Sequence, residues 1–162
     1  MEASLEQKIF ALLKKRNETV TFAESLTGGL VSARFVDVAG VSAVYKEGYI
    51  SYSDDAKKKF FHVSEEVLHV HTAVSEPCAR QMAIGARDAA GCDWALSVTG
   101  EAGPVPSGDL PVGLVYAGIC HGDFSAVEKF TFQGDRRQIR EAACEGALLL
   151  LYNSILQAEE GS

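Results

Sequence analysis

Apolar residues recur at two spacings along this chain, and these spacings separate predicted helices from predicted strands. Near the start, Leu5, Ile9 and Leu12 with Leu13 are three or four residues apart, the pattern of a helix with one buried face that ends near residues 15–16. Residues 19–23, with the sequence T-V-T-F-A, are rich in β-branched and aromatic side chains and predict a short buried strand.

The same alternation continues to the end of the chain. One helix is predicted over residues 30–38. Further helices are predicted to begin after caps at Ser53 and Asp135, and at the helix start S-E-P of residues 75–77. Further strands are predicted over residues 45–52, 94–99, 113–121 and 125–132, the last two joined as a hairpin through residues 121–124. Residues 63–71 predict a short helical connection, and residues 100–111 a loop rich in glycine and proline.

This order of elements predicts one α/β domain over residues 1–162. Helices alternate with strands until a hairpin breaks the alternation, which favours three α/β/α layers around a mixed β-sheet. No segment of 20–50 residues repeats, which excludes a solenoid. A chain of 162 residues removes roughly 70% of its unfolded surface from water on folding, enough for a core without disulfides or metals.

Composition and charge limit the classes of function. The chain is 47% hydrophobic with a formal net charge of −7, which argues against binding to nucleic acid in general. It has no run of 18 apolar residues, and charges interrupt residues 1–16, so we expect neither a membrane span nor a signal peptide, and a cytoplasmic location. The cysteines and histidines lack metal-ligand spacing, so we expect structural or surface roles and no metal; they are Cys78, Cys92, Cys120, Cys144, His62, His69, His71 and His121.

The first segment with candidate chemistry is E-S-L-T-G-G at residues 24–29. It joins a strand to a helix and so places Ser25 at the carboxyl edge of the sheet, where open α/β sheets bind ligands. The N–H groups of Gly28 and Gly29 can approach an anion or an oxyanion closely, helped by the dipole of the next helix. The alternative is a plain helix cap with glycines for tight packing.

The second segment, residues 48–57, ends at Lys57. A serine hydroxyl needs a base to act as a nucleophile, and a lysine is that base only if its pKa falls. The dipole of its own helix would favour this fall, whereas Asp54 and Asp55 would oppose it. The alternative is that Lys57 belongs to a solvated helix face together with residues 58–59.

Two later segments carry candidate ligand contacts. Residues 97–104 run from a strand into a glycine loop, where Thr99 and the Gly100 N–H can contact polar groups of a ligand. Arg136 and Arg140 are four residues apart on one helix face, so both can address one phosphate. Arginines paired with surface acids are the alternative.

Together these segments resemble a known family. E-S-L-T-G-G at 24–29, Y-S-D-D-A-K at 52–57, A-V-S-E at 73–76, T-G-E-A-G-P at 99–104, P-V-G at 111–113 and G-D-R at 134–136 occur in this order. They resemble the C-terminal domain of the competence/damage-inducible CinA family, over residues 19–151. The likeness is to the stand-alone type that includes nicotinamide mononucleotide (NMN) deamidase, without the amino-terminal domain of two-domain members.

The resemblance implies hydrolysis of the NMN carboxamide to nicotinic acid mononucleotide and ammonia, for recycling of pyridine nucleotides. It implies a small-molecule nucleotide substrate, no cofactor and a homo-oligomer. By position, Ser25 matches the catalytic serine of the family, Lys57 the catalytic lysine and Tyr52 an active-site tyrosine. The positions that match residues around the substrate are Thr27, Thr99 and Arg140.

The chain departs from the family pattern in the loop after residue 100. Glu101 stands where isoleucine is usual, and Leu110 where lysine is frequent. Both differences make the expected pocket more negative and bear on the substrate more than on the fold. Two rival functions remain open: a nucleotide-binding or regulatory module without turnover, and a deamidase of another small amide.

Overall fold

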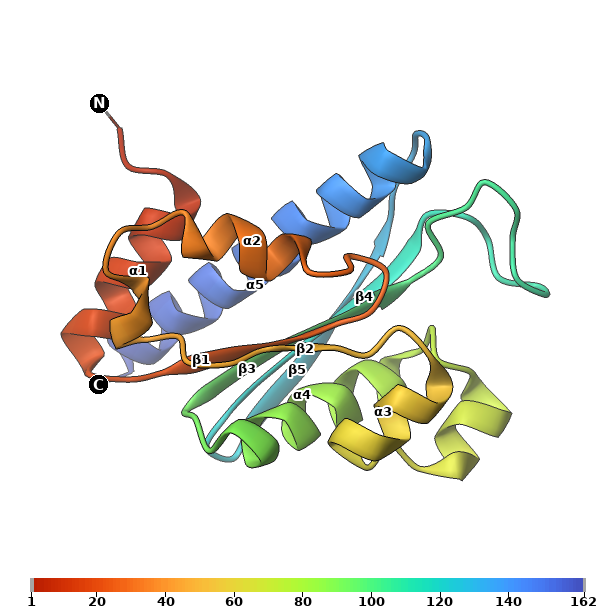
Figure 1. The fold of residues 1–162 in the computed structure, drawn as a ribbon, viewed down its shortest axis with the longest axis horizontal. Coiled ribbons are helices and arrows are strands. Elements are labelled where there is room, and N and C mark those ends of the chain that lie inside the picture. Colours follow the sequence, from red (N-terminus) through yellow and green to blue (C-terminus); the bar gives the residue numbers. More distant parts are fainter. Residues whose placement is uncertain (1, 162) are drawn as a thin grey trace.

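Five strands form one mixed sheet in the order β2-β1-β3-β4-β5 (Figure 1). The computed structural model describes residues 2–161. β1 pairs in parallel with β2 and β3, whereas β4 is antiparallel to β3 and β5. The mixed sheet predicted from the order of elements is thus confirmed. The strand bounds are β1 Val20–Glu24, β2 Tyr49–Ile50, β3 Trp94–Gly100, β4 Leu114–His121 and β5 Phe124–Thr131.

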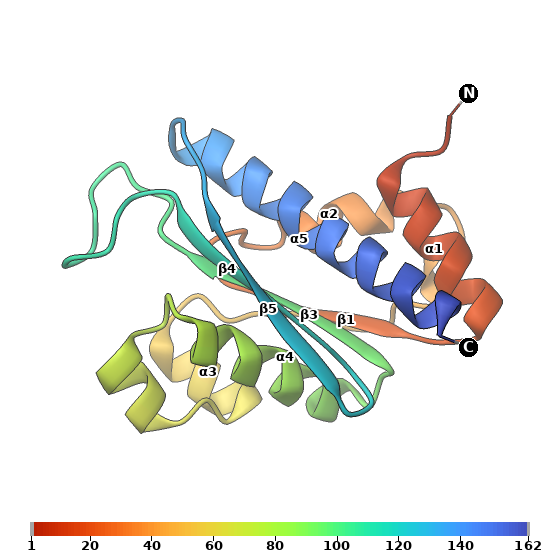
Figure 2. The ribbon, with the colours of Figure 1, turned by 180° about the vertical axis from the view of Figure 1, so that it is seen from behind.

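Helices cover both faces of this sheet, which confirms the three α/β/α layers (Figures 1 and 2). One face carries α1 (Leu5–Arg16), α2 (Leu30–Val36) and α5 (Arg136–Glu160). The opposite face carries α3 (Asp54–Phe61) and α4 (Glu76–Ala90). A 3₁₀ turn at Val41–Ala43 (η1) and a π-helical turn at Val67–His71 (η2) complete the helical elements of the described chain.

Local capping explains where several helices begin. Ser53 accepts from the Ala56 N–H at the start of α3, and Ser75 accepts from the Cys78 N–H at the start of α4. Asp135 and Gln138 form a reciprocal capping box at the start of α5. The predicted caps are confirmed, because a capping hydrogen bond depends only on residues within one turn.

Close packing fixes α4 against its neighbours. A Cβ atom on Gly85 would lie 2.2 Å from the backbone oxygen of Phe61, the last residue of α3. A Cβ atom on Gly118 of β4 would lie 2.5 Å from the backbone oxygen of Ala79. The absence of side chains at these two glycines lets α4 touch both α3 and the sheet.

The expectation of a strand over residues 45–52 is wrong for most of that segment. Only Tyr49–Ile50 pairs with β1, and Tyr45 makes an isolated bridge to Val20. The Tyr45 ring instead packs against Phe22, with ring centroids 5.3 Å apart, and its hydroxyl donates to Ser32. The β-like composition of this segment therefore reflects core packing at the sheet edge more than a continuous ladder.

Candidate active site

The carboxyl ends of the three parallel strands meet at one edge of the sheet. Ser25 follows β1 directly, residues 51–52 follow β2, and Thr99 and Gly100 end β3. Parallel pairing brings these strand ends together, because strands running in the same direction end at the same edge.

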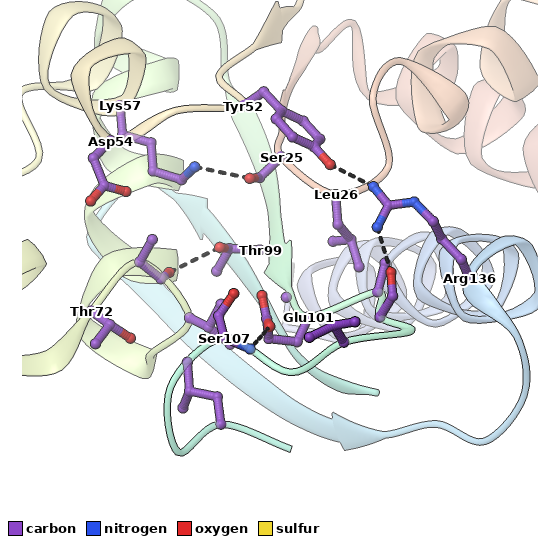
Figure 3. Close-up of a pocket in the computed structure, with 17 residues that line it drawn as sticks. Ser25, Leu26, Tyr52, Asp54, Lys57, Thr72, Thr99, Glu101, Ser107 and Arg136 are labelled. Carbon is purple, nitrogen blue, oxygen red and sulfur yellow. Dashed lines mark hydrogen bonds between the residues drawn. The ribbon is translucent and has the colours of Figure 1, made fainter. Parts of the chain in front are cut away.

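Ser25 and Lys57 form the central contact of this edge (Figure 3). Lys57 Nζ lies 2.9 Å from Ser25 Oγ, although the two residues are 32 positions apart. Lys57 is 1% exposed and Ser25 is 7% exposed. The pair thus lies in a largely dehydrated environment, which the alternative of a solvated lysine face does not allow.

Burial lowers the pKa of Lys57. Removal of its side chain from water lowers the pKa of the amine, and this effect outweighs the opposing influence of Cys78 and Asp54. Lys57 Nζ also lies 2.7 Å from the backbone oxygen of Ser51. A neutral amine can donate to Ser51 and still accept the Ser25 hydroxyl proton through its lone pair.

A cavity of about 490 Å³ opens onto the Ser25–Lys57 pair. Residues expected from the sequence at this site that line it are Ser25, Tyr52, Lys57, Thr99, Gly100 and Arg136. Glu101 and Leu110, the two departures from the family pattern, line it as well. Lining residues without an expected role include Leu26, Asp54, Thr72, Ser107 and residues 102–103. The sequence could have indicated Ala102 and Gly103 as lining residues because they follow β3, and Asp54 because it stands in the first turn of α3. No pattern in the sequence indicated Thr72.

The glycines after Ser25 do not offer free N–H groups to a ligand, which corrects the expected anion site. The Gly28 N–H donates to the Ser25 backbone oxygen over 3.1 Å, and the Gly29 N–H donates to Glu24 over 3.1 Å. The buried Glu24 carboxylate also accepts from the N–H groups of Val31 and Ser32. A side chain of the protein itself therefore occupies the positive end of α2, at the place where an external anion was expected.

The other N–H groups of this turn differ in their access to the cavity. The Ser25 N–H donates to the Val98 oxygen over 3.0 Å, but those of Leu26 and Thr27 donate to no acceptor within residues 2–161. Leu26 lines the cavity next to Ser25. The Leu26 N–H is therefore the candidate oxyanion donor of the turn, since Thr27 is fully buried and does not line the cavity.

Arg140 lies behind this turn, outside the cavity lining. Its Nε donates to the Leu26 oxygen over 2.8 Å, and its Nη2 donates to the Thr27 oxygen over 2.9 Å. Thr27 is fully buried, and its hydroxyl has no hydrogen-bond partner among the described residues. The structure therefore places Thr27, Gly28, Gly29 and Arg140 around the backbone of the Ser25 turn, and the expectation that both arginines face one ligand is not met.

Arg136 instead reaches the cavity mouth. Its Nη2 donates to the Tyr52 hydroxyl over 2.7 Å, and its Nη1 donates to the Gly103 oxygen over 2.6 Å (Figure 3). Tyr52 is 59% exposed, and in the described chain its hydroxyl bonds neither Ser25 nor Lys57. Tyr52 and Arg136 thus join residues 51–53 to the loop after β3.

Glu101 shapes that loop. Its N–H donates to the Leu114 oxygen, its backbone oxygen accepts from the Gly113 N–H, and its carboxylate accepts from the Ser107 N–H over 2.7 Å. Thr99 is held in a similar way, since its hydroxyl donates to the Ala73 oxygen over 2.9 Å. Glu101 therefore links both ends of the 101–113 loop to the strand region.

The fold and the site together define a three-layer α/β/α protein with a buried serine–lysine pair in a cavity at the carboxyl edge of its sheet. The sequence matches the CinA C-terminal domain over residues 2–155, and the chain belongs to this family.

Comparisons with known proteins agree with this assignment. A CinA-like protein of Kosmotoga olearia is 46% identical over 156 residues, which cover 96% of this chain and 38% of that protein. A CinA-like protein of Geobacter sp. strain M21 is 44% identical over 94% of this chain and 37% of its own length. The chain thus spans well under half the length of these relatives.

Solved structures are similar over nearly the full length of both chains. The CinA superfamily protein of Klebsiella pneumoniae 700603 matches with a TM-score of 0.91 and 32% identity, covering 94% of this chain and 96% of its own. The competence/damage inducible protein CihA of Agrobacterium tumefaciens matches with a TM-score of 0.87 and 34% identity, covering 92% and 93% of the two chains. No helix within residues 2–161 is long and apolar enough to cross a membrane.

Proposed function

We propose that this chain hydrolyses the carboxamide of nicotinamide mononucleotide, giving nicotinic acid mononucleotide and ammonia. The observation that carries the proposal is the contact of 2.9 Å between Lys57 Nζ and Ser25 Oγ, inside a cavity of about 490 Å³. A serine hydroxyl becomes a nucleophile when a base with a lowered pKa lies within hydrogen-bond reach. The burial that lowers the pKa of Lys57 meets this requirement.

In the first step, neutral Lys57 accepts the Ser25 proton while Ser25 Oγ attacks the carboxamide carbon. The carbonyl oxygen then carries negative charge, which the N–H group of Leu26 stabilises. When the C–N bond breaks, protonated Lys57 gives its proton to the leaving nitrogen, and ammonia departs. Water, deprotonated by the again neutral Lys57, then attacks the acyl carbon, and Lys57 returns the proton to Ser25 Oγ as the acid is released.

Two features hold this geometry in place. The Ser51 oxygen holds Lys57 Nζ from one side. The Gly28 N–H donates to the Ser25 backbone oxygen, which lies in the same peptide plane as the Leu26 N–H, and Arg140 holds the carbonyl groups of Leu26 and Thr27 next in the turn. Such preorganisation contributes to the rate because the dipoles need not reorient as charge develops.

The test is ammonia release from NMN by the parent protein and by Ser25→Ala and Lys57→Ala. Each substitution should abolish turnover and leave NMN affinity within about tenfold, or roughly 1.4 kcal/mol. Ser42→Ala and Lys59→Ala are matched controls, because both side chains are exposed and outside the cavity. Parent-like turnover by Ser25→Ala would refute the nucleophile, and NMN binding without turnover by the parent would favour the regulatory module instead.

A further inference from the structure

Two carboxylates, those of Asp54 and Glu101, line the cavity. Neither takes part in an ion pair of the described residues. The opposing positive charge at the cavity comes from Arg136, because the mechanism uses Lys57 in its neutral form. Besides Lys57, the side chains of a charged type that line the cavity are thus two carboxylates and one guanidinium.

Of these two acidic residues, Glu101 is better placed to act on a ligand in the cavity. Asp54 lies in the exposed first turn of α3, whereas Glu101 is half-buried and its backbone is held on both sides. One carboxylate oxygen accepts from the Ser107 N–H, and the other has no hydrogen-bond partner within residues 2–161. Figure 3 shows this carboxylate on the loop side of the cavity, opposite the Ser25–Lys57 pair.

Two other positive groups near the Ser25 turn, Arg140 and the amino end of α2, lie outside the cavity lining. The guanidinium of Arg140 donates to the carbonyls of Leu26 and Thr27. The positive end of α2 is occupied by the Glu24 carboxylate. A phosphate in the cavity would therefore meet Arg136 as its arginine, together with the repulsion of Glu101.

We propose that Glu101 is a specificity-determining residue that favours a cationic, phosphate-free pyridinium carboxamide, the riboside, relative to its 5′-phosphate. This inference rests on the proposed function and specifies its substrate class. Both compounds carry a positive pyridinium ring, but only the nucleotide adds the charge of a phosphate. A carboxylate within the cavity attracts the pyridinium ring and repels the phosphate. Its charge therefore changes the ratio of the activity on the riboside to the activity on the nucleotide.

The experiment compares kcat/KM for nicotinamide riboside and for NMN in the parent protein, Glu101→Gln and Asp109→Asn. Glutamine keeps an oxygen that can accept from the Ser107 N–H and removes only the charge. Asp109→Asn removes the same charge from an exposed position of the same loop that does not line the cavity. We expect Glu101→Gln to lower the riboside-to-nucleotide ratio about tenfold, and Asp109→Asn to leave it within about twofold.

Dissociation constants of both compounds, measured calorimetrically in a Ser25→Ala background with and without Glu101→Gln, separate this inference from the proposed function. Binding whose ratio shifts with Glu101→Gln, in a parent protein that releases no ammonia, would refute the deamidase and support the specificity role. Ammonia release with a ratio that stays within about twofold in Glu101→Gln would refute the specificity role alone. If neither compound binds, both proposals are overturned.

Discussion

Lys57 donates a hydrogen bond of 2.7 Å from its Nζ to the backbone oxygen of Ser51, while its side chain is 1% exposed. The lysine therefore keeps two hydrogen-bond partners at the end of its chain, Ser51 and Ser25, but little contact with water. Burial of this kind penalises the ammonium form and lowers the pKa. Catalysis and stability should both depend on this amine.

The first prediction concerns pH. Turnover should rise with pH as Lys57 loses its proton, with a midpoint below the ordinary lysine value of 10.5. Since the pKa is lower in the folded than in the unfolded chain, the unfolded chain binds more protons between the two values. The free energy of unfolding should therefore increase, so that the folded state becomes more stable, as pH rises through that range.

Lys57→Met tests this contribution, because methionine retains most of the apolar stem and cannot titrate. In a series from pH 6 to pH 9, the melting temperature of the variant should exceed that of the parent by the largest amount at pH 6. This difference should become smaller as pH rises. Parallel melting curves for the two proteins across the series would show that the lysine is not buried as a neutral amine.

The second prediction separates the two arginines of α5. Arg136→Ala should raise the KM for NMN about ten- to a hundredfold, the value of a charge-assisted contact, and affect the riboside less. Arg140→Ala should lower kcat on both substrates by similar factors, because Arg140 holds the backbone of the Ser25 turn. Steady-state kinetics on both substrates measure these effects. If Arg140→Ala raised the KM for NMN but not for the riboside, Arg140 and not Arg136 would be the residue that contacts the phosphate.

The third prediction concerns Glu18, at the opposite edge of the sheet. It accepts from Trp94 Nε1 over 3.0 Å and lies 2.7 Å from His121 Nε2, whose ring stacks on Trp94. Burial by itself would raise the pKa of Glu18, but hydrogen bonds from Trp94, Arg16 and His121 together lower it. The stabilisation is therefore present above the unfolded carboxyl pKa and is lost as pH falls through the folded value.

Glu18→Gln should cost about 1–3 kcal/mol in the free energy of unfolding at pH 7, as expected for a carboxylate with several hydrogen bonds. The cost should decline as pH falls from the ordinary carboxyl pKa through the lowered pKa of Glu18 in the folded chain, because the parent carboxyl is then itself protonated. Denaturant unfolding at several pH values measures it. Glu141→Gln, at an exposed pair with Arg137, is the control and should change stability by less than about 1 kcal/mol.

The fourth prediction concerns the contact between α3 and α4. Gly85→Ala would place a Cβ atom 2.2 Å from the Phe61 backbone oxygen, so α3 must move. Overpacking of this kind costs about 1–3 kcal/mol. Because α3 carries Lys57, we also expect a lower kcat at temperatures where the variant is fully folded. Unchanged melting temperature and kcat would show that the two helices are less tightly packed.

Several parts of the fold could be predicted from local sequence. The caps at Ser53 and Asp135 depend on residues one turn away, and the hairpin of β4 and β5 depends on a short turn between alternating segments. The segment before Ser53 shows the limit of this approach. Tyr45 has the composition of a strand residue, but its ring packs against Phe22 at the sheet edge and only Tyr49–Ile50 joins the ladder.

At the site, local sequence predicts that Ser25 follows a buried strand and that Lys57 lies inside a capped helix. That Lys57 Nζ reaches Ser25 Oγ depends on how α3 packs against the sheet, which no local pattern contains. The partners of Glu24, Arg136 and Arg140 were likewise decided by tertiary structure. Periodicity indicates which face of an element is buried, but the hydrogen-bond partner of a long polar side chain depends on which groups from distant segments are packed within its reach.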